Sequence, residues 1–147
     1  LDPYLFQIFN KYSGSDLNFA SKDRKNRTNI ISRDGRSFVI SEPTHYYDLV
    51  IVFSPEPDNA SINRFCTREF FQQVNRILKP DGVFCLFLPT HGAAFEYLSK
   101  ILINRTATIF RAKKSIFKNI LAVPVNGHLL LGSQSENRLT IDPEVLG

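Results

Sequence analysis

The run Asp-Leu-Val-Ile-Val-Phe at residues 48–53 limits most strongly what this chain can fold into. After its first residue the run is entirely apolar, and it shows no alternation between apolar and polar positions. This pattern is typical of a parallel strand that is covered on both faces. We therefore expect an inner strand of an α/β sheet here, with a ligand site beyond its carboxyl end.

Other segments of the chain carry helix and strand signals in alternation. The expected helices cover residues 3–12 after the Asp2-Pro3 start, a segment capped by Thr67 that stops at Lys79-Pro80-Asp81-Gly82, and residues 93–103. Asp34-Gly35 predicts a turn, which a short helix or turn follows to about Ser41. The expected strands cover residues 29–33, 83–88, 106–112, 120–124 and 128–132, the last two as a hairpin across Asn126-Gly127. This alternation predicts a parallel α/β sheet with a C-terminal antiparallel hairpin.

Composition argues against several classes of protein. The net charge is +4, and the basic clusters at residues 22–27 and 111–118 are more typical of solvated surface than of a nucleic-acid site, so no nucleic acid is expected. The two cysteines, Cys66 and Cys85, are too few for a disulfide framework or a metal site. The sequence has no apolar run long enough to span a bilayer. These features favour a reducing, cytoplasmic setting.

The residues that follow the expected strands are the candidates for a site. They are Asp34 and Gly35, then the segment 54–64 with Ser54, Glu56, Asp58, Asn63 and Arg64, and then the segment 89–92 with His91. Each also has a structural reading: Asp34-Gly35 can simply start a helix, the acids can be solvated loop residues, and a lone loop histidine is most often just exposed.

Four segments together resemble the core of spermidine synthases. They are Tyr47-Asp48-Leu49-Val50-Ile51-Val52, Ser54-x-Glu56-Pro57, Thr67-x-Glu69-Phe70-Phe71 and Leu78-Lys79-Pro80-Asp81-Gly82-Val83. Arg33-Asp34-Gly35-Arg36 also resembles the adenine-side Asp-Gly of that family. The segment from Pro55 to Phe71 is similar to spermidine-synthase-like domains fused to membrane segments in some bacteria, which implies a possible tether through a longer parent chain.

The resemblance implies a Rossmann-like, methyltransferase-type fold and aminopropyl transfer from decarboxylated S-adenosylmethionine, a co-substrate that is not held tightly. It implies adenosyl-group binding by Asp34, Gly35 and Ser54, and no metal. The family's catalytic Asp corresponds to Phe53, which cannot accept a proton. Glu56 and Asp58 are the acids that remain nearby as catalytic candidates. Asn63 and Arg64 are the substrate-side candidates, although Arg64 would repel a polyamine.

The family's glycine-rich loop is absent, since no Gly-x-Gly occurs in the chain. We therefore expect residues 1–147 to form a single domain that lacks the first strand of the fold and is inactive alone. Either the remaining strands close up, or a second copy or the remainder of a larger protein fills the gap. Two alternatives stay open: an S-adenosylmethionine-dependent methyltransferase, and a non-catalytic module that binds a nucleoside, a polyamine or a partner.

Overall fold

The structure is a computed structural model, and it describes residues 31–54, 59–89, 100–125, 127–136 and 138–140. The chain divides into two compact units, Leu1–Phe38 and Val39–Gly147. Helix α2 (Gly35–Ser41) begins in the first unit, so the segment expected to be a short helix or a turn is a helix. The remaining elements belong to the second unit: β1 (Tyr47–Phe53), α3 (Ala60–Asn63), α4 (Arg68–Ile77), β2 (Leu78–Leu88), α5 (Lys100–Lys114), β3 (Asn119–Val125) and β4 (Gly127–Ser133).

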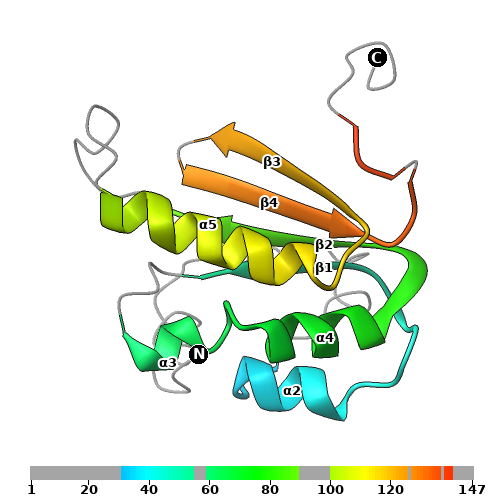
Figure 1. Cartoon of the computed structure of the whole chain (residues 1–147). Helices are drawn as coiled ribbons and strands as arrows, with labels where there is room; N and C mark the ends of the chain where they lie inside the picture. Colours follow the sequence, from blue (N-terminus) through cyan, green and yellow to red (C-terminus); the bar gives the residue numbers. More distant parts are fainter. Residues whose placement is uncertain (1–30, 55–58, 90–99, 126, 137, 141–147) are drawn as a thin grey trace, which may run out of the picture. The chain divides into compact units, whose positions relative to one another are not determined.

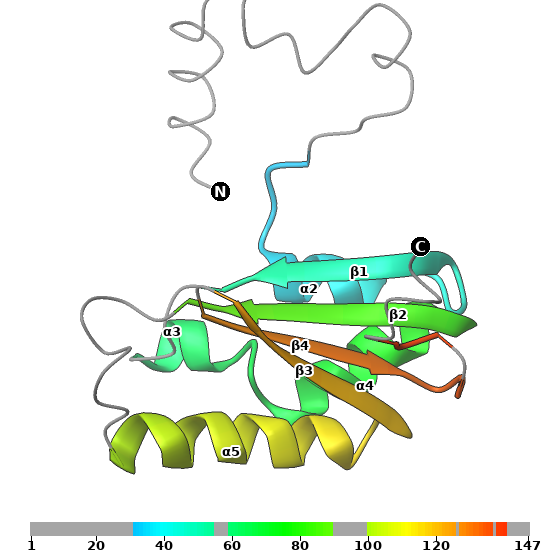
Figure 2. The same cartoon turned by 90° about the horizontal axis from the view of Figure 1, so that it is seen from above.

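The described strands form one sheet in the order β1-β2-β4-β3, which can be followed in Figure 1 and Figure 2. β1 and β2 are parallel, whereas β4 runs antiparallel to both β2 and β3. The mixed α/β sheet and its C-terminal hairpin confirm the fold class predicted from the sequence. Gly127 opens β4 with a φ of 132°, and a Cβ there would lie 2.5 Å from the Leu88 carbonyl oxygen, so this corner requires glycine.

Helix α4 forms as the sequence predicts. The Thr67 side chain accepts a hydrogen bond from the Phe70 amide at 3.3 Å, which caps the first turn. The helix buries one apolar stripe, made of Phe70, Phe71, Val74 and Ile77. This stripe packs against the sheet, because the Phe71 ring lies 5.7 Å from the ring of Phe84 on β2. The Phe84 ring in turn stacks on Phe117 at 5.7 Å.

Arg76 of α4 forms hydrogen bonds with the end of α2. Its guanidinium donates to the carbonyl oxygens of Val39 at 2.9 Å, Ile40 at 3.2 Å and Glu42 at 2.9 Å. These carbonyls belong to the last helical turn and the residue after it, where a helix leaves acceptors without an internal partner. A cation at this position also complements the negative end of the helix.

The expected strand at residues 106–112 is wrong, because these residues lie inside helix α5. The run Thr-Ala-Thr-Ile-Phe has the β-branched composition of a strand. The helix forms nevertheless, and it buries the apolar Ile109 on the face that also carries Lys113, four residues along. Packing has overridden local propensity here. The front part of the helix expected at residues 93–103 lies outside the described residues.

Residues 48–53 form the predicted strand, but the expectation that this strand is an inner one is wrong for the described part of the chain. β1 is the last strand of the sheet there, and no described strand pairs with its other side. Of the strand expected at residues 29–33, residues 31–33 are described and are not in a strand. Direct closing of the gap between these two segments is therefore not found among the described residues.

The turn expected at Lys79-Pro80-Asp81-Gly82 is wrong, because these residues lie inside strand β2, where its pairing with β1 is irregular. Tyr47 pairs with Leu78 and Leu49 pairs with Val83, so the segment between Leu78 and Val83 bulges opposite the single residue Asp48. Lys79 reaches back from this bulge to Asp48 at 2.7 Å. In the part of the chain that the structure describes, no helix is long and apolar enough to cross a membrane.

Candidate functional site

Ser54 lies where two parallel strands end together. It follows β1 directly, is buried, and its amide donates to the carbonyl oxygen of Phe87 on β2 at 3.3 Å. Because parallel strands bring their carboxyl ends to one edge, Ser54 and the end of β2 share that edge. This is the position at which open α/β sheets bind ligands.

Asn63 is the last residue of the short helix α3 and Arg64 is its C-cap; the helix lies at the side of the sheet where β1 and β2 end (Figure 2). The Asn59 side chain accepts from the Ile62 amide at 3.0 Å and so begins this turn. The Asn63 side chain is exposed, whereas Arg64 is half-buried with its guanidinium carbon 4.9 Å from the centre of the Phe65 ring. The structure thus places three of the predicted site residues at one end of the sheet, with a cation held on an aromatic face.

Asp34 and Gly35 belong to the start of helix α2. One carboxylate oxygen of Asp34 accepts from the Ser37 amide at 3.0 Å, and the Asp34 carbonyl accepts from the Phe38 amide at 2.9 Å. The side chain therefore acts as a helix cap, which is the structural reading of this Asp-Gly pair. The Asp34 side chain is exposed.

The acids Glu56 and Asp58 lie outside the described residues, as does His91, and their roles stay predictions. Phe53, at the position of the expected catalytic Asp, is described. Its side chain is 76% exposed, and its ring centre lies 5.8 Å from that of Phe87. Phe53 has no atom that can accept a proton, so it contributes apolar surface to this end of the sheet.

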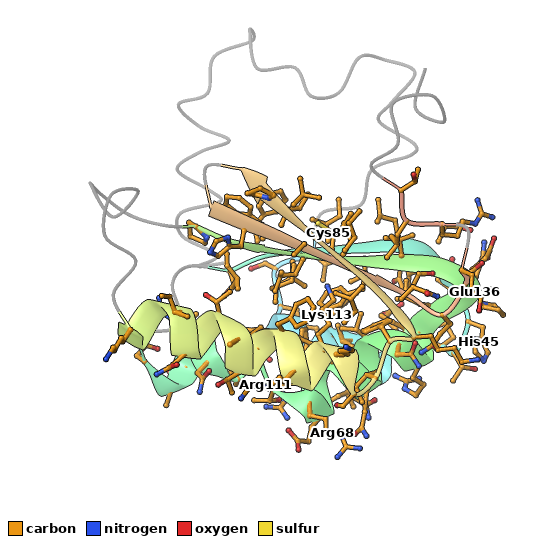
Figure 3. All side chains as sticks on the ribbon, turned by 45° about the horizontal axis from the view of Figure 1, so that its top comes forward. His45, Arg68, Cys85, Arg111, Lys113 and Glu136 are labelled. Carbon is orange, nitrogen blue, oxygen red and sulfur yellow. The ribbon has the colours of Figure 1, made fainter. Side chains whose placement is uncertain are left out.

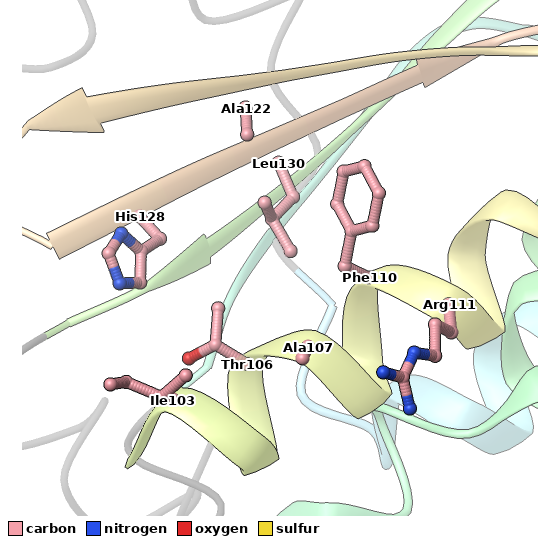
Figure 4. A pocket seen from close by; sticks show the side chains of 8 residues that line it. All are labelled: Ile103, Thr106, Ala107, Phe110, Arg111, Ala122, His128 and Leu130. Atoms are coloured by element: carbon pink, nitrogen blue, oxygen red, sulfur yellow. The ribbon is translucent and has the colours of Figure 1, made fainter. Parts of the chain in front are cut away.

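A cavity of about 410 Å³ lies between α5 and the β3–β4 hairpin (Figure 4). Its lining is mostly apolar, with polar groups at Thr106, Arg111 and His128. His128 pairs with Leu88, so it too lies beside the carboxyl end of β2. In the sequence, His128 simply follows the Asn126-Gly127 turn, and no motif marks it as a site residue. Its position beside the cavity depends on strand pairing between distant segments.

Lys113 is a second residue that the sequence did not distinguish, because it lies in a basic cluster interpreted as solvated surface. Its side chain is fully buried between α5 and the sheet (Figure 3). Its Nζ donates to the carbonyl oxygens of Leu130 and of Phe84, the latter at 3.3 Å, and lies 4.1 Å from the Phe84 ring centre. Burial lowers the pKa of Lys113 from 10.5 to about 7.

Both cysteines are free and buried. Burial raises the pKa of Cys66 to about 11 and also raises the pKa of Cys85, so neither thiol is prepared to react as a thiolate. Among the residues that the structure describes, no group of three or more His, Cys, Asp or Glu side chains could hold a metal ion.

Comparison with known proteins links this geometry to one family. Residues 6–138 match the model of the spermine/spermidine synthase domain. The chain is 28% identical over 139 residues to a polyamine aminopropyltransferase of Clostridium botulinum, which covers 92% of this chain and 46% of that protein. It is 37% identical over 78 residues to putrescine N-methyltransferase 2 of Nicotiana tabacum, which covers 53% of this chain and 22% of that protein.

Two solved structures share the fold. A spermidine synthase in complex with the transition state analogue AdoDATO superimposes with a TM-score of 0.71 at 20% identity, covering 97% of this chain and 48% of that one. Human methyltransferase-like protein 13 in complex with SAH gives a TM-score of 0.68 at 19% identity, covering 99% of this chain and 63% of that one. The chain spans less than half the length of the Clostridium botulinum aminopropyltransferase and of the Nicotiana tabacum methyltransferase. Since the family model covers most of its length, the chain belongs to the spermine/spermidine synthase domain family.

Proposed function

We propose that this chain forms part of an adenosyl-nucleoside site in a protein related to polyamine aminopropyl transfer, and that it does not catalyse the transfer by itself. The supporting observation is the parallel pair β1–β2 with the buried Ser54 at its carboxyl edge, in a chain that matches the family over residues 6–138. Ligands of such sheets bind at that edge. Two proteins with the same fold have been solved with the adenosyl ligands AdoDATO and SAH.

The lack of activity follows from the chemistry of the transfer. An amine nitrogen attacks the carbon next to the sulfonium, a C–N bond forms as the C–S bond breaks, and methylthioadenosine leaves. The attacking nitrogen must lose a proton, which calls for a carboxylate within hydrogen-bond reach. Phe53 cannot take this proton. In the proposal Glu56 anchors the distal ammonium of a polyamine. Glu56 or Asp58, which follow Phe53 closely in the sequence, is the candidate replacement for the missing base.

The nucleoside side of the proposed site uses Asp34, Gly35 and Ser54. The Asp34 carboxylate and the Gly35 amide would bind the adenine edge, while Ser54 lines the strand end. Asn63 and Arg64 would contact the second substrate. A guanidinium attracts carboxylate or phosphate and repels a polyamine cation, so Arg64 favours a substrate that carries an anionic group.

A methyltransferase is the second candidate. The observation that favours it is the 37% identity over 78 residues to putrescine N-methyltransferase 2, a protein whose name describes methyl transfer to an amine. S-adenosylmethionine would then replace its decarboxylated form as co-substrate. A third candidate is a non-catalytic module, in which the loop after Phe53 binds a nucleoside or a polyamine but does not support catalysis.

Titration calorimetry separates these functions. The 147-residue chain, and a longer parent if one exists, is titrated with methylthioadenosine, S-adenosylhomocysteine and spermidine, and each is assayed for turnover. Binding of methylthioadenosine without aminopropyl transfer supports the proposal. Methyl transfer to an amine supports the methyltransferase, and polyamine binding without turnover supports the binding module. Binding of none of the three ligands contradicts the proposal.

A matched pair of variants locates the site. Asp34→Asn should weaken methylthioadenosine binding at least 10-fold, since the adenine edge loses a charged acceptor (roughly 1.5–3 kcal/mol). Asp48→Asn removes an exposed carboxylate that forms an ion pair with Lys79 at the surface and should leave binding unchanged.

Three expectations from the sequence stay predictions. They are attachment to a membrane through a longer protein, a reducing compartment, and association with a second copy.

A further inference from the structure

Two cavities lie along strand β3, on the side where helix α5 packs. The first is the cavity of about 410 Å³ between α5 and the β3–β4 hairpin (Figure 4). The second has a volume of about 340 Å³ and lies at the beginning of β3, where residues 119–121 form part of its lining. Phe110 of α5 lines both, so the two cavities meet at this side chain. We call the pair the α5–β3 groove.

The larger cavity offers apolar walls. In Figure 4 the Phe110 ring points from α5 toward the hairpin. The apolar residues of the lining come from both elements: Ile103, Ala107, Phe110, Ala122 and Leu130. None of the described residues that line this cavity is an acid. Pockets for small ligands have volumes of roughly 300–1,000 Å³ and mostly apolar walls, so this cavity suits one slender apolar group.

The smaller cavity carries cationic groups. Lys114 and Lys118 line it, with Glu136 as its one acid among the described residues. Arg111 lines the larger cavity, three residues before Lys114 and therefore on the same side of the helix. Neither lysine side chain forms an ion pair within the part of the chain that the structure describes. The cations outnumber the acid along the groove, which favours a ligand with an anionic group.

A donor without an acceptor adds a second, independent observation. Asn119 lines the smaller cavity, and its side-chain Nδ2 is buried with no hydrogen-bond partner among the described residues. A buried donor that lacks an acceptor costs free energy. The χ2 torsion of asparagine is soft, so this N–H group can turn toward an anionic oxygen in the cavity.

We propose that the α5–β3 groove binds a small amphipathic carboxylate, with its apolar chain in the larger cavity and its carboxylate beside Lys114 and Lys118. The chain removes apolar wall from water, and the carboxylate supplies the charge that the lysines lack. A neutral molecule would satisfy only the first of these needs, and a small anion only the second. The groove includes none of Asp34, Ser54 and Arg64, so the proposal does not rest on nucleoside binding.

Octanoate, acetate and 1-octanol test the two halves of the groove separately. Each is titrated into the 147-residue chain, and the backbone amide signals are followed by NMR. Octanoate should bind saturably and shift the signals of Phe110, Lys114 and Ala122 together. Acetate should not saturate, and 1-octanol should bind more weakly than octanoate. Acetate that binds as tightly as octanoate overturns the proposal. So does an absence of saturable octanoate binding, for example because a segment of the chain itself fills the groove.

A pair of double variants tests the charge. Lys114→Gln with Lys118→Gln should weaken octanoate binding roughly 10-fold, because each exposed ion pair contributes a few-fold, and should leave 1-octanol binding unchanged. Lys100→Gln with Arg68→Gln is the matched control, since it removes two exposed cations that line neither cavity. Equal effects of the two double variants on octanoate binding overturn the proposed place of the carboxylate.

A second pair of variants tests the apolar cavity. Ala107→Phe places a ring in the space for the chain and should weaken both octanoate and 1-octanol at least 10-fold. Thr108→Phe adds the same ring at the next position, which is exposed and lines neither cavity, and should leave both affinities unchanged. Unchanged octanoate binding by a folded Ala107→Phe variant overturns the proposed place of the chain. If Ala107→Phe does not fold, the lysine variants still decide the proposal.

Discussion

Replacing Lys113 by Met should make the protein more stable near neutral pH and less stable at alkaline pH. Lys113 is fully buried, and burial lowers its pKa from 10.5 to about 7. In the unfolded chain the same group keeps its ordinary pKa. Between pH 7 and 10.5 the unfolded state therefore binds one more proton at this position than the folded state. The free energy of unfolding must rise with pH across that window.

The size of the effect follows from the two pKa values. They differ by about 3.5, and each pKa unit corresponds to 1.36 kcal/mol, so the buried amine costs about 5 kcal/mol at pH 7 and nothing above pH 10.5. Met removes this cost. It also removes the hydrogen bonds to the Leu130 and Phe84 carbonyls, which are worth about 1 kcal/mol each at any pH in the window. The variant should be about 3 kcal/mol more stable at pH 7 and about 2 kcal/mol less stable near pH 10.5.

Urea unfolding at pH 7, 8, 9 and 10 measures the difference between the two proteins. Other groups that titrate in this range cancel, because both proteins contain them. Lys114→Met is the control: this neighbour is exposed and should show no such dependence on pH. A difference between wild type and Lys113→Met that stays constant from pH 7 to pH 10 would refute the reasoning.

Three further changes test other parts of the structure by urea unfolding and calorimetry. Thr67→Ala should cost about 1 kcal/mol, because the Phe70 amide loses its acceptor, and an unchanged midpoint would contradict the cap. Gly127→Ala should cost roughly 1–3 kcal/mol, since its Cβ would meet the Leu88 carbonyl oxygen at 2.5 Å. Gly132→Ala should cost a similar amount, because its Cβ would lie 2.8 Å from Cε of Lys113; pairing it with Lys113→Ala should recover part of that loss, and no recovery would argue against this contact.

The sequence by itself determined the elements whose signals are local. The cap at Thr67, the apolar stripe of α4, and the strand at residues 48–53 all follow from residue type and spacing along the chain. The hairpin followed in the same way from its turn residues. The ordered motifs also indicated the family, since they keep its spacing along almost the whole chain.

Only the tertiary structure decided what depends on packing between distant segments. Residues 106–112 have the composition of a strand but form part of helix α5, in which the apolar Ile109 is buried. One lysine of a basic cluster became a buried group because the sheet lies directly above it (Figure 3). His128 reached the end of β2 through strand pairing. Among the described strands, the edge position of β1 is likewise a property of strand order, which no local pattern encodes, since an apolar run looks the same whether one or two strands lie beside it.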